Sequence, residues 1–205
     1  MVRKILPPLL VLAGLMLAGC GEYGEVEQGR AVAFDKEKST VSIIIDTNLD
    51  PKKPPAYTEL PPHDYILPTD PMERGADPSV GLRMTLDVEK KIIKMYNPRS
   101  KAFEELSFEV VKDEQRVDVR RRHPLVWDQG ANKAKRFPDF DEANKVVKLY
   151  SGRQQRYTEI KLSADDYAKY KGDEWNAGDE CRFYYKEKGK SLRFYNITKT
   201  DISRR

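Results

Sequence analysis

Apolar and polar residues alternate with a period of two through most of this sequence, and that pattern restricts the fold more than any other feature. It recurs in paired runs, each pair separated by a short polar turn, over residues 32–45, 84–96, 146–162 and 182–195. Successive side chains of a β-strand point to opposite faces, and two such runs around a polar turn are typical of a β-hairpin. A further strand is expected over residues 106–111. The sequence therefore predicts a mainly β protein built from antiparallel hairpins.

Helix signals are few. Ser163 is a candidate N-cap, Asp165 and Asp166 lie in the first turn that follows it, and Gly172 is a stop signal, which together predict a helix of two turns. A weaker helix is expected over residues 139–145. Both helices are short, so they are additions to a β fold.

The turn Gly178-Asp179, ahead of the last hairpin, resembles the turn that opens a strand in small OB-like and SH3-like barrels. The resemblance implies that antiparallel hairpins form a small OB-like or SH3-like barrel or sandwich, with one or two short helices. It places the barrel in the last third of the chain. Strand and turn patterns of this kind carry information about fold and none about function.

Residues 51–78 hold eight of the 13 prolines. Proline has no N–H to donate to a ladder, so we expect no central strand and no long helix in this segment. The interpretation we favour is a loop packed over one end of the sheet through four apolar side chains, and a partner-docking segment and a disordered segment are the alternatives. Those side chains are Tyr57, Tyr65, Ile66 and Leu67.

The first twenty residues have the pattern of a targeting signal. Arg3 and Lys4 precede an apolar run, Ile5 to Leu17, that is too short to cross ~30 Å of hydrocarbon as a helix. The run ends in Leu17-Ala18-Gly19-Cys20, which resembles the lipobox of bacterial lipoproteins. Together with the proline-rich insert, the lipobox resembles an uncharacterised family of bacterial lipoproteins, from which no function is inherited.

The lipobox resemblance implies a lipid anchor. Residues 1–19 would be removed as a signal peptide, and Cys20 would become an acylated N-terminus that attaches the chain to a membrane without a transmembrane helix. In the sorting rule of Gram-negative bacteria, an Asp after the lipidated Cys retains a lipoprotein in the inner membrane. Gly21 stands at that position here. We therefore expect placement in the outer membrane, facing the periplasm.

These features divide the chain into segments of different character. A signal peptide over residues 1–19 is followed by a tether over 20–28, an N-terminal β-rich region over 29–120 that includes the proline-rich insert, and a C-terminal barrel-like region over 121–205. The two β-rich regions form either one continuous domain or two. The oligomeric state is left open.

Several classes of chemistry have little support. His63, His123 and Cys181 are each about sixty residues from the next, without the close ligand pairs of a zinc signature. No nucleophile-elbow, Walker or dinucleotide-binding glycine motif occurs. We therefore expect no cofactor, no metal and no catalytic site. Because Cys20 is expected to carry lipid, Cys181 should have no partner for an intramolecular disulfide.

The charge is unevenly distributed, although lysines and arginines exceed acids by only four over the whole sequence. Residues 116–136 carry seven bases and two acids, or +5, and residues 181–205 carry eight bases and two acids, or +6. Residues 163–180 carry six acids and two lysines, or −4. A solvated face whose charges cancel between neighbouring strands accounts for this pattern, and binding of an anion is the alternative. Nucleic acid is not an expected partner outside the cytoplasm.

Arg120, Arg121 and Arg122 form the densest group of like charges. They follow a strand expected to run over residues 110–119, so two of them would share one face and the third would lie on the other. At least one arginine then faces solvent or an anion. We expect this group to orient the domain on its own membrane or on an acidic partner.

The function that best fits these observations is a non-catalytic envelope lipoprotein, which acts as a binding or accessory component held at the membrane by Cys20. The expected partners are the membrane itself and an envelope protein or anionic envelope component. The rival hypothesis is a periplasmic enzyme with a dispersed site near His123, Trp127 and Asp128. A small-ligand carrier would need a barrel with an empty apolar interior, which the sequence does not test.

Overall fold

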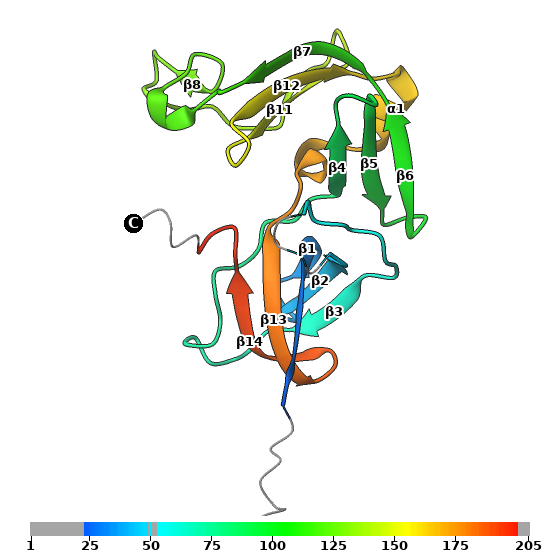
Figure 1. Ribbon diagram of the computed structural model, residues 1–205, viewed down its shortest axis with the longest axis vertical. Coiled ribbons are helices and arrows are strands. Elements are labelled where there is room, and N and C mark those ends of the chain that lie inside the picture. Colours follow the sequence, from blue (N-terminus) through cyan, green and yellow to red (C-terminus); the bar gives the residue numbers. More distant parts are fainter. Residues whose placement is uncertain (1–22, 49, 51–52, 201–205) are drawn as a thin grey trace, which may run out of the picture.

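The computed structural model describes residues 23–48, 50 and 53–200 of the 205-residue chain, so the targeting signal and Cys20 lie outside the described residues. The protein is mainly β, as predicted (Figure 1). Its helical segments are α1 (Ala164–Lys169) and the 3₁₀ turns η2 (Val119–Arg121) and η3 (Gly172–Trp175). Its strands are β1 (Glu25–Asp35), β2 (Thr40–Ile45), β3 (His63–Ile66), β4 (Arg83–Asp87), β5 (Ile92–Asn97), β6 (Ala102–Ser107), β7 (Glu109–Gln115), β8 (Trp127–Asp128), β9 (Lys133–Ala134), β10 (Asp139–Asp141), β11 (Val146–Ser151), β12 (Arg156–Lys161), β13 (Glu180–Glu187) and β14 (Lys190–Asn196).

A small closed barrel forms one end of the molecule. Its strand order is β1-β13-β14-β3-β2. The long strand β1 pairs with β13 through residues 25–30 and with β2 through residues 29–35. The barrel thus combines strands from near both ends of the described residues, whereas we had expected it within residues 121–205. The difference arises because β1 and β13 pair although they are about 150 residues apart in the sequence, and the local alternation pattern does not predict which distant strands pair.

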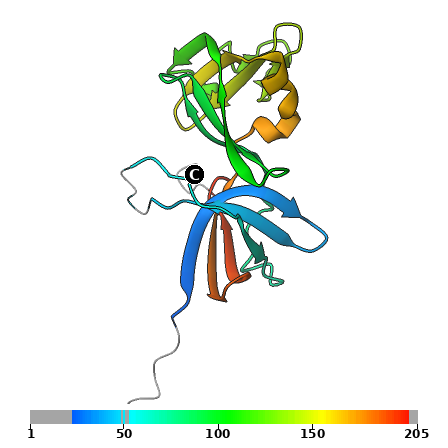
Figure 2. The same cartoon turned by 90° about the vertical axis from the view of Figure 1, so that its right-hand side faces the viewer.

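The other end of the molecule holds the remaining sheets (Figures 1 and 2). A three-stranded sheet has the order β4-β5-β6, and a four-stranded sheet has the order β10-β11-β12-β7. Strands β8 and β9 form a separate small hairpin. The chain leaves the barrel after β3, builds these sheets, and returns through α1 and η3 to β13.

Two main apolar cores hold these parts together. Inside the barrel, the rings of Tyr65 and Phe183 stack with their centroids 4.6 Å apart, and Phe194 packs on Phe183. The second core joins the three-stranded and four-stranded sheets around Trp175, whose indole N–H donates to the carbonyl oxygen of Tyr170 at 3.0 Å. Barrel strands also contribute Val32 and Ile44 to this second core. The sheets therefore pack directly on the outside of the barrel.

All four predicted hairpins are confirmed, as β1–β2, β4–β5, β11–β12 and β13–β14. The predicted helix is confirmed as α1, and its N-cap Ser163 accepts a hydrogen bond from the backbone N–H of Asp166 at 3.1 Å. The helix ends at Lys169, earlier than expected. The second predicted helix, over residues 139–145, is wrong, because residues 139–141 pair with β11 as strand β10.

The proline-rich segment differs from its expected role. Strand β3 lies within it and closes the barrel, pairing antiparallel with β2 and meeting β14 in a parallel bridge between Lys190 and Ile66. The prediction that the segment holds no central strand is therefore wrong. The four residues of β3 stand between Pro62 and Pro68, so their backbone N–H groups remain available to the ladder. Tyr57 and Leu67 are buried as expected, whereas the side chain of Ile66 is 48% exposed.

Candidate functional site

Arg120, Arg121 and Arg122 lie in a turn after β7 and not in the strand itself. Strand β7 ends at Gln115, and Arg116 has a positive φ of 61°. Asp118 then caps the 3₁₀ turn η2, its carboxylate accepting from the backbone N–H of Arg120 at 2.9 Å. The expectation that a strand continues to residue 119 is therefore wrong. A capping aspartate followed by a left-handed residue, Arg122, favours a tight turn over a continuing ladder.

The three arginines make different contacts in this turn. The guanidinium of Arg120 pairs with Asp118 at 3.2 Å, and hydrogen bonds from its side chain and backbone hold the pKa of that carboxyl below its ordinary value. Arg122 lies over the ring of Trp127, with its guanidinium carbon 5.3 Å from the ring centroid. Arg121 has no ion-pair partner within 4 Å in the described part of the chain. One arginine is thus neutralised, one is stacked, and one is unpaired.

A groove of about 500 Å³ opens beside this turn, between the β8–β9 hairpin and the four-stranded sheet. Four basic side chains line it, and Lys148 is neutralised by an ion pair with Asp139 at 2.8 Å. The three other basic side chains, together with the remaining acid Asp128, give the groove a net charge of +2. They are Lys133, Lys135 and Arg136.

The basic side chains of the groove differ in how freely they can meet a ligand. Lys135 donates to the carbonyl oxygen of Pro124 at 2.9 Å, which fixes its position. Lys133 and Arg136 are exposed, and neither has an ion-pair partner among the described residues. Two exposed cations therefore face the groove, and Asp128, the register partner of Lys133, is the acid beside them.

The floor of the groove is aromatic. The rings of Phe137 and Tyr157 meet edge to face with centroids 5.8 Å apart, and Tyr157 belongs to a small buried cluster with Val117 and Val126. Val119 of η2 and Phe137 of the groove both pack against this cluster. The groove and the arginine turn thus rest on the same small apolar cluster.

His123, Trp127 and Asp128, the residues of the rival enzyme hypothesis, lie beside the groove but do not form a joint site. His123 Nδ1 accepts from the backbone N–H of Leu125 at 3.3 Å. Asp128 accepts from the backbone N–H of Ala131 at 3.0 Å, and this hydrogen bond, with the nearby Lys133, keeps the pKa of Asp128 below its ordinary value. No hydrogen bond joins His123 to Asp128 in the described ranges.

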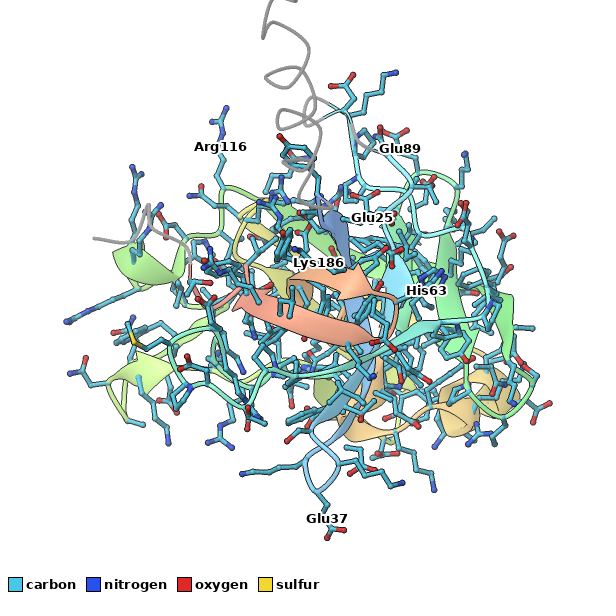
Figure 3. The ribbon with its side chains drawn as sticks, turned by 90° about the horizontal axis from the view of Figure 1, so that it is seen from below. Glu25, Glu37, His63, Glu89, Arg116 and Lys186 are labelled. Atoms are coloured by element: carbon cyan, nitrogen blue, oxygen red, sulfur yellow. The ribbon has the colours of Figure 1, made fainter. Side chains whose placement is uncertain are left out.

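Sequence reasoning missed a second polar cluster, at the end of the barrel seen in Figure 3. The carboxylate of Glu27 accepts from Tyr65, from Tyr185 at 2.9 Å and from His63 Nδ1 at 2.8 Å. Burial alone would raise the pKa of Glu27, but these hydrogen bonds outweigh it and hold the pKa below its ordinary value. The alternation of side chains along β1 could have indicated this cluster, because it puts Glu27 on the same face of the strand as the buried Ala31. The bulge in β1 comes only after Ala31 and does not change this relationship.

Neither cluster has the composition of a metal centre. Across residues 23–48, 50 and 53–200, no group of three or more His, Cys, Asp and Glu side chains is placed to hold a metal ion. His63, His123 and Cys181 lie apart: His63 at the barrel end, His123 beside the groove, and Cys181 in the barrel core. What the groove offers chemically is positive charge over an aromatic floor.

Comparison with known proteins places almost the whole of this architecture in one family. The family profile matches residues 22–205, which include the barrel, the groove and the arginine turn. The chain belongs to the DUF4881 family. DUF4881 is a domain of unknown function, which confirms the expectation of an uncharacterised family. No curated protein and no solved structure shows significant similarity to the chain. None of the helices in the described part of this DUF4881 protein has the length and apolar character needed to cross a bilayer.

Proposed function

We propose that this DUF4881 protein is a non-catalytic lipoprotein of the cell envelope, which binds an anionic partner through its basic groove while Cys20 holds it at a membrane. The lipobox Leu17-Ala18-Gly19-Cys20 supports the anchor. Gly21 in place of Asp supports the outer membrane, with the domain facing the periplasm.

The position of the groove is the observation that carries the proposal. In Figure 1, the β8–β9 hairpin and the arginine turn lie at the end of the long axis opposite to the start of β1. Strand β1 begins at Glu25, so the chain from Cys20 to the barrel reaches at most ~18 Å when extended. The barrel end would then lie at the membrane and the groove would point away from it. This arrangement favours an acidic partner over the protein's own membrane as the ligand of the groove.

The groove fits carboxylate or phosphate groups. Arg136 presents a planar guanidinium group that binds two such oxygens at once, and Lys133 adds a more mobile charge. Phe137 and Tyr157 supply an apolar surface beneath them. A partner segment with spaced acidic groups and an apolar side chain between them would match this surface.

Binding of a poly-glutamate peptide, followed by fluorescence anisotropy at low and at raised salt, tests the groove. Residues 20–205 with Cys20→Ser contain every described strand and helix and are suitable for this measurement. We expect salt-sensitive binding, which a Lys133→Gln/Arg136→Gln variant weakens. The control is Lys36→Gln/Lys38→Gln in the β1–β2 turn, which removes the same charge and should bind as the parent does. Equal binding by the groove variant and the control would contradict the proposed site.

A further inference from the structure

The outer face of the barrel carries a surface that the groove does not explain. We propose that the face formed by β1, β13 and β14, with the turn between β13 and β14, lies on the headgroup layer of the membrane that holds the acylated Cys20. This inference rests on the lipid anchor of the proposed function. It assigns the barrel a fixed orientation, with this hairpin as its membrane contact.

The hairpin lies next to the point where the tether enters the barrel. Glu25, the first residue of β1, is the register partner of Tyr185 on β13, and the β13–β14 turn follows two residues later. Figure 1 shows this turn at the same end of the molecule as the start of β1, and Figure 3 labels Glu25 and Lys186 at that end. A lipid on Cys20 would therefore hold this end of the barrel, including the hairpin, close to the bilayer.

The outer face of the hairpin is unusually apolar for an exposed sheet. Val26, Leu192 and Tyr195 are 58%, 49% and 46% exposed, and they line one open groove of about 570 Å³ together with Tyr184. Val26 and Tyr184 are register partners, so these side chains form a continuous strip across β1 and β13. Large exposed apolar side chains gathered on one face mark an interaction surface.

The same hairpin carries a net positive charge. Residues 180–196, from the start of β13 to the end of β14, carry five bases and two acids, or +3. Arg193 is paired with Glu73, and Lys190 with Glu187 at 3.0 Å. Lys186 and Lys188 are exposed and have no ion-pair partner among the residues described. Tyrosine rings beside lysine and arginine are the composition of a membrane interface, where the apolar parts enter the headgroup layer and the charges meet lipid phosphates.

A bilayer fits this face better than a second copy of the chain. In a symmetric dimer the same patch would face itself, so two hairpins of net positive charge would meet. Like charges placed opposite each other oppose association. An anionic bilayer instead supplies the opposite charge over a broad, flat area, and the short tether holds it nearby.

Vesicle co-sedimentation tests the proposal without the lipid anchor. Residues 20–205 with Cys20→Ser are mixed with vesicles of phosphatidylglycerol and phosphatidylethanolamine, and with vesicles of phosphatidylcholine alone. We expect binding to the anionic vesicles that weakens with salt, and much weaker binding to the neutral ones. Because a basic residue near an anionic bilayer contributes about 1 kcal/mol, or roughly fivefold in the binding constant, Lys186→Gln/Lys188→Gln/Lys190→Gln should weaken binding at least about tenfold.

Two matched variants separate this face from the rest of the surface. Leu192→Ser should weaken vesicle binding, whereas Val111→Ser, equally exposed at 53% but on β7, should not. Lys36→Gln/Lys38→Gln/Lys90→Gln removes three lysines from other hairpin turns and should cost much less than the triple lysine variant.

Absence of binding to anionic vesicles, or equal loss in the face variants and their controls, would overturn the proposed contact. So would a dimer in sedimentation velocity that Leu192→Ser dissociates, because the face would then be occupied by a second copy. Acylation plays no part in this assay. Failure here is therefore distinguishable from failure of the lipid anchor, which fatty-acid labelling of Cys20 tests separately.

Discussion

Gly81 and Gly178 lie against each other where the chain leaves the barrel and where it returns to it. A Cβ atom on Gly81 would stand 2.5 Å from the backbone nitrogen of Gly178 and 2.2 Å from the carbonyl oxygen of Asn176. Gly178 has a φ of +72°, and its own Cβ would stand 2.3 Å from the carbonyl oxygen of Ala31. The segment that leaves the barrel, the segment that returns to it, and β1 are therefore in contact through backbone atoms alone at this point. This contact joins the barrel to the sheets.

We predict that Gly81→Ala lowers the free energy of unfolding by about 2 kcal/mol or more, because backbone atoms that cannot rotate away would have to move. Gly152→Ala is the matched control, since its Cβ would meet no atom closer than 3.8 Å. Urea denaturation measures both. A Gly81→Ala protein as stable as the control would show that the junction is looser than these distances indicate.

Glu27 is predicted to make stability depend on pH. Its pKa in the folded protein is held below the ordinary value of 4.5, so it stabilises the fold above that pH and loses this contribution as pH falls through the folded pKa. Glu27→Gln should cost about 2 kcal/mol at neutral pH, where the charged acceptor of Tyr65, Tyr185 and His63 is lost. Thermal denaturation across pH should show the difference from the parent shrinking in acid.

Glu37→Gln, in the exposed turn between β1 and β2, serves as the control for that series and should show little effect at any pH. A Glu27→Gln penalty that stays constant from neutral to acidic pH would mean that the charge of Glu27 is not what stabilises the barrel end.

Cys181 is predicted to remain a free, unreactive thiol. It is fully buried in the barrel core, and burial raises the pKa of the thiol well above its ordinary value, so little thiolate forms at neutral pH. We expect an aromatic disulfide reagent to react with Cys181 only after unfolding, and reductant to leave the stability of the native protein unchanged. Rapid labelling of the native protein, or destabilisation by reductant, would contradict this.

The arginine turn should act on an acidic partner and not on the membrane. Replacing Arg120, Arg121 and Arg122 with Gln should leave the fold intact. Among the described residues, the ion pair lost is the one between Arg120 and the buried Asp118, whose carboxylate still accepts from the backbone N–H of residue 120 and from Gln155. Poly-glutamate binding should weaken, and binding to anionic vesicles should stay as in the parent. If vesicle binding weakens while poly-glutamate binding does not, the turn faces the membrane instead.

Local elements were predictable from the sequence, and long-range pairings were not. The β13–β14 hairpin follows from alternation around a short turn, and α1 follows from the Ser163 cap, because both are decided by neighbouring residues. The pairing of Glu25 with Tyr185 is not visible in this way, since it depends on which of many alternating strands meet. Strand β3 was not predicted because the segment around it is rich in proline, although the prolines flank the strand and none lies within it.

The candidate site, like the fold, was predictable in its local sequence features and not in its long-range contacts. The excess of positive charge over residues 116–136 could be counted directly, and it contains Lys133, Lys135 and Arg136 of the groove. The groove itself could not be predicted, because it forms where the segment of the β8–β9 hairpin meets Lys148 and Tyr157 of the four-stranded sheet, and this contact is not local in sequence.

The account depends most on the lipid anchor, and mass spectrometry of the N-terminal peptide tests it directly. The protein is expressed from its full-length sequence in a Gram-negative host, and its N-terminal peptide is analysed from the membrane fraction. We predict a peptide that begins at Cys20 and carries a diacylglycerol on its thiol, and a Cys20→Ser protein that keeps residues 1–19 and takes up no fatty-acid label. A peptide that begins elsewhere, or an unmodified Cys20 in the mature protein, would contradict the account.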